Sequence, residues 1–143
     1  MSYEIIEGMT RADIAVRIHA PHLHDLFIEA GRALASIVIE NCESIRPVIS
    51  RAIRCEAAAI DLLLHEFLQE LIFVKDAEKI ILLPAGVDIM EDGDRCFLSA
   101  QAQGERIDRT RHLTRTDVKA VTLHGLSVEQ SGGAWVATVV LDV

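Results

Sequence analysis

The segment from Ala58 to about Val74 narrows the possible folds more than any other, because its apolar residues recur at helical spacing over a broad face. A stripe this wide predicts a central helix that is packed against other elements. Asp61 falls in the first turn, where a carboxylate interacts favourably with the positive end of the helix dipole. The apolar positions of this predicted helix are Ile60, Leu63, Leu64, Phe67, Leu68 and Leu71.

The remainder of the chain alternates between strand and helix signals. A loosely alternating run from Ile14 to His19 predicts a strand, which Pro21 ends. An amphipathic run from His22 to about Ile39 predicts the first helix. Further strands are predicted at residues 48–56, 80–90, 96–104, 118–129 and 135–142.

Two glycine-containing turns join the later strands into hairpins. Asp92-Gly93 lies between the strands at 80–90 and 96–104, and Gly132-Gly133 lies between the last two. The order of elements predicts an α+β fold, with two helices packed on a largely antiparallel or mixed sheet. No linker or low-complexity segment interrupts the chain, so a single domain is expected over residues 1–143.

The length, composition and net charge of the chain exclude several classes of protein. The 143 residues suffice for one domain with a real core, and 50% hydrophobic residues with 25% charged ones exclude disorder. No apolar run reaches about 18 residues and no secretory signal begins the chain, so we expect no membrane contact. A net charge of −8 opposes nucleic-acid binding through the overall field. The cysteines are widely spaced, which predicts reduced thiols in a cytoplasmic protein; they are Cys42, Cys55 and Cys96.

Acidic groups gather at the end of the sequence. The chain stops at Asp142-Val143, directly after an apolar run that predicts a strand, so a terminal carboxylate is expected beside that of Asp142. Adjacent anions repel each other unless a cation bridges them, and Ca²⁺ and Mg²⁺ favour such oxygen clusters. The first predicted strand offers Asp13 as a further carboxylate. Asp142 and the terminal carboxylate of Val143 are therefore candidate ligands of a divalent cation, and the question is whether Asp13 joins them.

One stretch of this acidic chain is locally basic, from Arg106 to Arg115. Because arginine forks suit phosphate, Arg109, Arg111 and Arg115 are candidate contacts for a nucleotide or RNA. A solvated loop is the alternative interpretation of the same residues.

Lys119 is expected on a strand, on the same side as Asp117. Charged groups beside a strand core need partners. Lys119 is therefore a candidate to neutralise a carboxylate cluster or to reach a phosphate, and a surface salt bridge is the alternative.

The second helix contains an incomplete zinc-protease motif. That motif needs a second histidine four residues after His65, so that two imidazoles share one helix face, but Gln69 stands there. The incomplete motif indicates a solvated helix face and not a metal site.

Three blocks of sequence, in order along the chain, are similar to the archease family. The first contains Ala12-Asp13-Ile14 with the segment 25–30, and the second contains Asp61-Leu62-Leu63 with the segment 66–71. The third and most specific contains Arg111-His112, the segment 118–128, Trp135 and the final Asp142-Val143. Together these blocks span nearly the whole chain.

This resemblance implies a non-enzymatic activator. Archeases assist the GTP-dependent tRNA-splicing RNA ligase, promoting guanylylation of its histidine and repeated turnover, so contact with RNA and GTP would be indirect. Family members bind a divalent cation, often calcium, through the Asp of the first motif and the Asp–aliphatic end. Carried over, the metal ligands are Asp13, Asp142 and the main chain of Val143, and the candidates for ligase activation are Lys119, Arg11 and Asp61.

The first motif departs from the family pattern. Where archeases usually have His-Thr-Ala-Asp or His-Gly-Ala-Asp, this chain has Thr10-Arg11-Ala12-Asp13 and lacks the histidine. Arg11 either weakens metal affinity or points outward to contact the partner. Two rival functions are a chaperone-like or RNA-binding adaptor without a ligase role, and a metal-dependent hydrolase that uses the same carboxylates.

Overall fold

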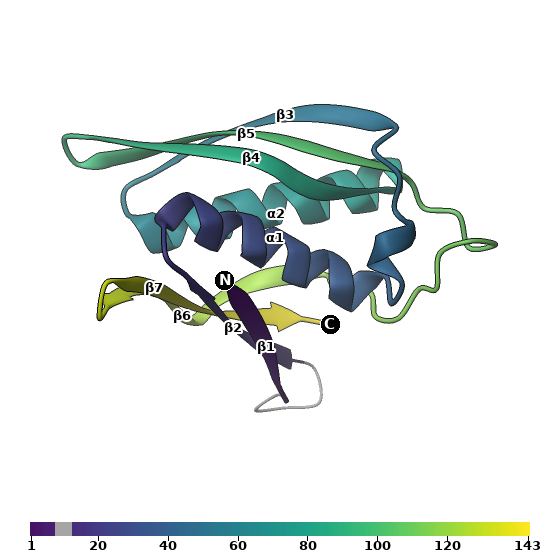
Figure 1. Ribbon diagram of the computed structural model, residues 1–143, viewed down its shortest axis with the longest axis horizontal. Coiled ribbons are helices and arrows are strands. Elements are labelled where there is room, and N and C mark those ends of the chain that lie inside the picture. The colour runs from purple at the N-terminus through teal and green to yellow at the C-terminus, as the bar shows by residue number, and fades with distance from the viewer. Residues whose placement is uncertain (8–12) are drawn as a thin grey trace.

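The protein has three layers, with two helices lying between two antiparallel sheets (Figure 1). This computed structural model describes residues 1–7 and 13–143. The helices are α1 (Leu23–Val38) and α2 (Ile60–Glu78). The predicted α+β class is therefore confirmed, although the strands divide between two sheets, one on each side of the helices.

The first sheet has four strands, in the order β1-β2-β7-β6. Its strands are β1 (Ser2–Glu7), β2 (Asp13–Ala20), β7 (Ala134–Asp142) and β6 (Ala120–Ser131). β2 and β7 lie at its centre, and the buried pairs Val16–Val139 and Ile18–Ala137 face the helices. Strands from the two ends of the described chain thus form the middle of this sheet.

The second sheet has three strands, in the order β3-β5-β4. Its strands are β3 (Ile49–Ala57), β5 (Arg95–Arg106) and β4 (Ile80–Asp92), and a short 3₁₀ helix, η1 (Cys42–Ser44), precedes them. In β5, buried and exposed residues alternate along most of the strand. One face of this sheet therefore covers the helices and the other faces solvent.

The predicted elements agree with the structure to within a few residues, with two differences. β1 was not predicted, and β6 begins at Ala120 and not at 118. Asp117 and Lys119 consequently precede the strand, in a segment without regular secondary structure that is fixed by side-chain and main-chain contacts.

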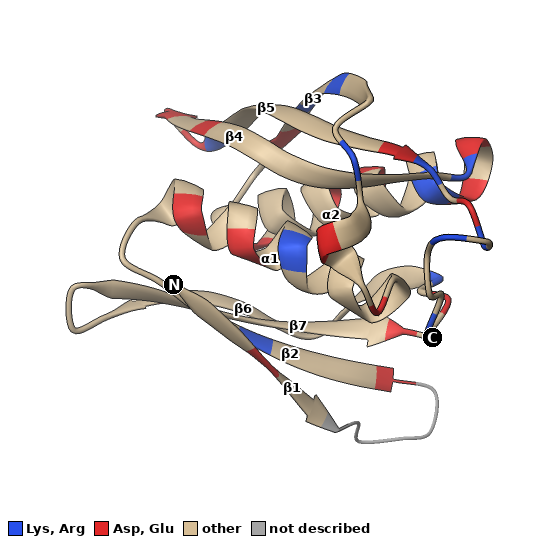
Figure 2. Cartoon of the chain, turned by 45° about the vertical axis from the view of Figure 1, so that its right-hand side comes forward, with Lys and Arg blue, Asp and Glu red and all other residues tan. Residues whose placement is uncertain are grey.

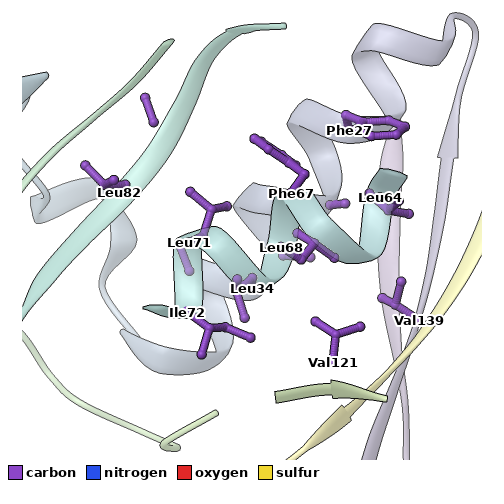
Figure 3. Packing of buried hydrophobic residues seen from close by; sticks show 14 of the residues in the cluster. Phe27, Leu34, Leu64, Phe67, Leu68, Leu71, Ile72, Leu82, Val121 and Val139 are labelled. Carbon is purple, nitrogen blue, oxygen red and sulfur yellow. The ribbon is translucent and has the colours of Figure 1, made fainter. Parts of the chain in front are cut away.

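Both helices contact both sheets, which explains why their apolar faces are so wide. α1 packs on β2 and β4, and α2 packs on β3 and β6. The rings of Phe27 and Phe67 meet at the centre of the helical layer with centroids 6.0 Å apart (Figure 3). Leu82 approaches this layer from one sheet and Val139 from the other (Figure 3). The prediction of a central α2 is thus confirmed.

The cysteines are free thiols, as expected. Burial raises the pKa of both Cys42 and Cys55 to about 11, so the unreactive thiol form prevails near neutral pH. Among the helices of the described residues, none combines the length and apolar character needed to cross a bilayer.

Gly104 lies where the main chain of β4 approaches β5 closely. A Cβ at this position would lie 1.8 Å from the main-chain oxygen of Ile81, so no larger residue fits without moving the backbone. Gly86, in the same sheet, has no neighbouring atom within 4 Å of a built Cβ.

We expect Gly104→Ala to lower the free energy of unfolding by about 3 kcal/mol, because overpacking against main-chain atoms forces the two strands apart. Gly86→Ala is the matched control and should change stability by about 1 kcal/mol or less. Urea unfolding followed by circular dichroism measures both variants. Equal midpoints for the two would contradict the close approach of β5 to β4.

Candidate functional site

Asp13 and Asp142 are direct cross-strand partners at one end of the first sheet. Side chains in directly opposite positions share a face, with Cβ atoms about 4.5–5.5 Å apart. Asp142 follows the buried Leu141, so its side chain lies on the face away from the helices. The acidic start of β2 and the acidic end of β7 lie side by side near the label C (Figure 2). Strand register thus brings together two of the predicted metal ligands.

Val143 follows Asp142 directly in the sequence, and it is half-buried and packs against the core. Among residues 1–7 and 13–143, no group of three or more His, Cys, Asp or Glu side chains is placed to hold a metal ion. Two carboxylates with main-chain oxygen do fit a hard cation that also takes oxygens from elsewhere.

Lys119 joins this end of the sheet through its main chain. Its N–H donates to the main-chain oxygen of Asp142 at 2.8 Å. Its exposed side chain lines a hollow beside α2, with Phe73 and Asp76, and so lies on the helix side of the sheet. Lys119 is therefore adjacent to Asp142 in space, but the two side chains belong to opposite faces.

The two remaining candidates for partner contact lie elsewhere. Asp61 occupies the first turn of α2, where its carboxylate accepts a hydrogen bond from the N–H of Leu62 at 2.8 Å. Twelve residues separate it from Phe73, or about 18 Å along the helix axis. Arg11 and Thr10 lie outside the described residues, as does the departure from the family motif.

The segment between β5 and β6 is held firmly at its centre by the buried carboxylate of Glu105. That carboxylate accepts hydrogen bonds from the N–H of Arg46 at 2.6 Å, from the guanidinium of Arg111, and from Nε2 of His112 at 3.2 Å. Nδ1 of His112 in turn accepts the N–H of Asp108, so Nε2 is the nitrogen that carries the proton. This cluster ties the segment to the residues that lead into β3.

The pKa of Glu105 reflects this environment. Burial alone would raise it, but the hydrogen bonds from Arg46, Arg111 and His112 outweigh burial and hold it below its ordinary value. Glu105 is therefore an ionised side chain in the interior, and its charge is matched by the arginine.

The three arginines predicted to contact phosphate have different surroundings. The half-buried guanidinium of Arg111 donates hydrogen bonds within the protein, to Glu105 and to the main-chain oxygen of Ser44. Arg115 lies 3.7 Å from Glu40 and its N–H donates to Val38 at the end of α1. The basic residues of this segment lie at the end of the molecule labelled C (Figure 2).

Arg109 is exposed, and it makes no hydrogen bond or ion pair within the described part of the chain. It lines a hollow of about 420 Å³ next to the C-terminal ends of both helices, together with Lys79 and Arg115. Helix C-termini carry partial negative charge, so cations here already serve to balance the helix dipoles. Because these cations already balance the helix dipoles, a phosphate site in this hollow is less well supported. Of the three arginines, Arg109 is the best candidate to contact a phosphate.

Lys75 connects α2 to the segment before β6. Its buried ammonium contacts Asp76 and donates to Asp117 at 2.8 Å. Burial would lower the pKa of Lys75, but the two carboxylates outweigh burial and raise it, and the same hydrogen bond lowers the pKa of Asp117. The segment that carries Lys119 is therefore anchored to the helical layer.

His65 and Gln69 bind the main chain of β6, so the prediction of a solvated helix face is wrong for these two residues. Nε2 of His65 lies 2.9 Å from the oxygen of Val121, and Oε1 of Gln69 accepts the N–H of the same residue. Both main-chain groups lie at the outer edge of the first sheet, and α2 supplies the partners that a further strand would otherwise provide.

The sequence model of the Archease protein family matches residues 3–143. Protein archease of Methanopyrus kandleri is 32% identical over 143 residues, which is all of both chains. Protein archease of Pyrococcus furiosus is 29% identical over 133 residues, covering 92% of this chain and 93% of its own.

Two solved structures have a similar fold. The solution structure of protein 1598 of Methanobacterium thermoautotrophicum matches with a TM-score of 0.85 and 27% identity, over 99% of each chain. The crystal structure of an archease from Thermotoga maritima, described as a possible chaperone, matches with a TM-score of 0.62 and 17% identity, over 98% of each chain. The second likeness concerns the fold alone.

We expect Glu105→Gln to lower the free energy of unfolding by about 2 kcal/mol at about pH 7, because charged hydrogen bonds contribute about 1.5–3 kcal/mol each. The folded-state pKa of Glu105 lies below its unfolded value. Its stabilisation is therefore full above about pH 4.3 and is lost as the pH falls through the folded-state pKa. Urea unfolding at about pH 7 and about pH 3 measures this difference.

The exposed Glu129 provides the control, since Glu129→Gln should leave stability unchanged at either pH. A gap between wild type and Glu105→Gln that is the same at both pH values would contradict a stabilising role for the charge.

Proposed function

The chain belongs to the archease family, and on that premise we propose that it activates a GTP-dependent tRNA-splicing RNA ligase. It would act by docking on the ligase and promoting guanylylation and multiple turnover. The activator is not an enzyme in this proposal, because the bond-forming chemistry stays in the ligase. The complex would act in the cytoplasm, and contact with RNA and GTP would be indirect, through the ligase.

The observation that carries the proposal is the pairing of Asp13 with Asp142 in the first sheet. Two like charges in directly opposite positions destabilise a strand pair unless another group offsets them. A bound divalent cation would be such a group. The pair therefore supports a functional use of the two carboxylates.

The proposed cation site consists of Asp13, Asp142 and the main chain of Val143, and the family resemblance favours calcium. A bound divalent cation would bridge phosphate oxygens and offset their charge. Calcium takes about six to eight oxygens, so these residues would supply only part of its ligands. Oxygens of the partner, of GTP or of water would supply the remainder, which suits a site that acts at an interface.

Other residues of the proposal have positioning roles. Lys119 fixes the end of β7 through its hydrogen bond to Asp142 and presents its side chain to the partner. Asp61 and Arg11 are further candidate contacts for the ligase. Arg109, with Arg111 and Arg115, is a candidate contact for phosphate.

We expect sub-stoichiometric amounts of this protein to accelerate the labelling of a purified cognate RNA ligase by radioactive GTP. Asp142→Ala should reduce this stimulation roughly tenfold or more, as expected for loss of a metal-binding residue. Asp88→Ala is the matched control, because Asp88 is an exposed carboxylate on the other sheet, and it should retain full stimulation.

Stimulation by Asp142→Ala that equals wild type would refute the role of the carboxylate pair. No stimulation by the wild-type protein would refute the activator function itself. In that case an RNA-binding adaptor becomes the better proposal, and it predicts that RNA binding by the isolated protein weakens steeply with salt.

Calcium binding tests the site without the ligase. We expect calorimetric titration of the wild-type protein to detect calcium binding, and Asp13→Asn to lower the affinity roughly tenfold or more. Unchanged calcium affinity in Asp13→Asn would show that the cation binds elsewhere.

A further inference from the structure

The start of β6 forms a short ladder with the end of β7, apart from the remainder of both strands. Residues 120–122 lie opposite residues 140–142. The register then shifts, and regular pairing resumes only at Ser127, opposite Thr138. A bulge of this kind disrupts a ladder locally and leaves its extra residues unpaired. The pairs that end at Asp142 are therefore separated from the longer ladder on the other side of the bulge.

Two side chains of α2 hold this short ladder at its central residue, Val121. The Nε2 of His65 lies 2.9 Å from the main-chain oxygen of Val121, and Oε1 of Gln69 accepts a hydrogen bond from its N–H. A carbonyl oxygen only accepts, so Nε2 of His65 carries a proton. Residues four apart share one face of a helix, which allows both side chains to reach one residue. The buried side chain of Val121 also lies against α2, near Leu68 (Figure 3). We call His65 and Gln69 the α2 clamp.

The α2 clamp is connected to Asp142 by two short paths. Val121 lies opposite Leu141, and Asp142 is the next residue of β7. In addition, the N–H of Lys119 donates to the main-chain oxygen of Asp142 at 2.8 Å. Lys119 is only two residues from Val121, so a displacement of Val121 from α2 would also displace this donor. The main chain of Asp142 therefore depends on α2 as well as on its pairing with β2.

A further contact attaches the other side of Lys119 to the same helix. The ammonium group of Lys75 donates to Asp117 at 2.8 Å. The segment 117–121 is thus attached to α2 at both ends, by Lys75 at one end and by the α2 clamp at the other. Without the clamp, only the end at Asp117 would remain attached to α2. The clamp is therefore the contact that fixes Lys119 on the side of β6.

We propose that His65 and Gln69 are positioning residues of the proposed cation site. The α2 clamp holds Val121 and, with it, the main chain that binds Asp142. This inference rests on the proposed function for the cation, whereas the effect of the clamp on the main chain can be measured without one. Contacts that orient metal ligands have a large effect on metal affinity, although they do not touch the metal. Neither residue is assigned a contact with the ligase or with GTP.

The experiment combines calorimetric titration with calcium and amide hydrogen exchange followed by NMR. His65→Leu removes the donor to Val121 and should lower calcium affinity roughly tenfold or more, as expected for loss of a contact that orients a ligand. It should also accelerate exchange of the Lys119 N–H roughly tenfold or more, because this end of the ladder opens more often. Exchange of the Ala102 N–H should stay unchanged, since Ala102 is buried in the central strand of the other sheet.

Three further variants separate positioning from general destabilisation. His65→Gln retains a nitrogen donor and should restore both calcium affinity and slow exchange of the Lys119 N–H. Gln69→Met has a similar length without an acceptor oxygen and should reproduce the effects of His65→Leu. Phe73→Leu is the matched control, because Phe73 is 61% exposed on the same helix and makes no hydrogen bond to β6 within the described part of the chain. It should leave both measurements unchanged.

Wild-type calcium affinity and Lys119 exchange in both His65→Leu and Gln69→Met would show that the positioning role is wrong, and the proposed cation site would stand. Faster exchange of the Lys119 N–H with unchanged calcium affinity would also overturn the inference, because Asp142 would then keep its position. Equal acceleration at Ala102 would indicate a general loss of stability and count against it as well. If the wild type binds no calcium, the cation site fails, and exchange of the Lys119 N–H alone decides whether the clamp positions Asp142.

Discussion

The pairing of β2 with β7 is the constraint on which the core and the candidate site both depend. Val16 and Ile18 face the helices opposite Val139 and Ala137, and a slip of one residue would turn every one of these side chains toward solvent. The apolar residues therefore set the register, and the register alone places Asp13 opposite Asp142. Two carboxylates with no contribution to the core are held together by the residues that form it.

The connection from β5 to β6 shows how irregular backbone is fixed when a sheet and two helix ends meet. Its main-chain groups bond to Asn41, Val38 and Lys79, and its centre is held by the charged cluster of Glu105. Among the described residues, every buried side-chain nitrogen or oxygen has a hydrogen-bond partner. Such complete satisfaction favours one conformation, because any rearrangement would leave a buried polar group without a partner. The position of Lys119, at the end of this connection, is therefore fixed relative to the first sheet.

Most of the regular elements were predictable from the sequence, because α2, β5 and the two hairpins carry strong periodic and turn signals. β1 escaped prediction since its residues are mostly exposed, and an edge strand shows little alternation. The cation site was predicted from acidic residues and family resemblance. The strand register places Asp13 opposite Asp142, and the binding of a cation there stays a prediction. The structural roles of three polar residues could not be predicted, because each forms a hydrogen bond with a residue distant in the sequence. They are Glu105, Lys75 and Gln69. Their only local signal was a polar residue interrupting an apolar pattern.

Asp13 and Asp142 belong to opposite ends of the described chain, so the surface they form is absent from any partly folded state in which β2 and β7 are unpaired. Closing such a long loop is entropically costly, and contacts of this separation form late in folding. Any ion or protein that bridges the two carboxylates binds the folded chain alone and stabilises it by mass action. Binding at this surface would therefore depend on the pairing of β2 with β7, because a copy of the chain without that pairing lacks the surface.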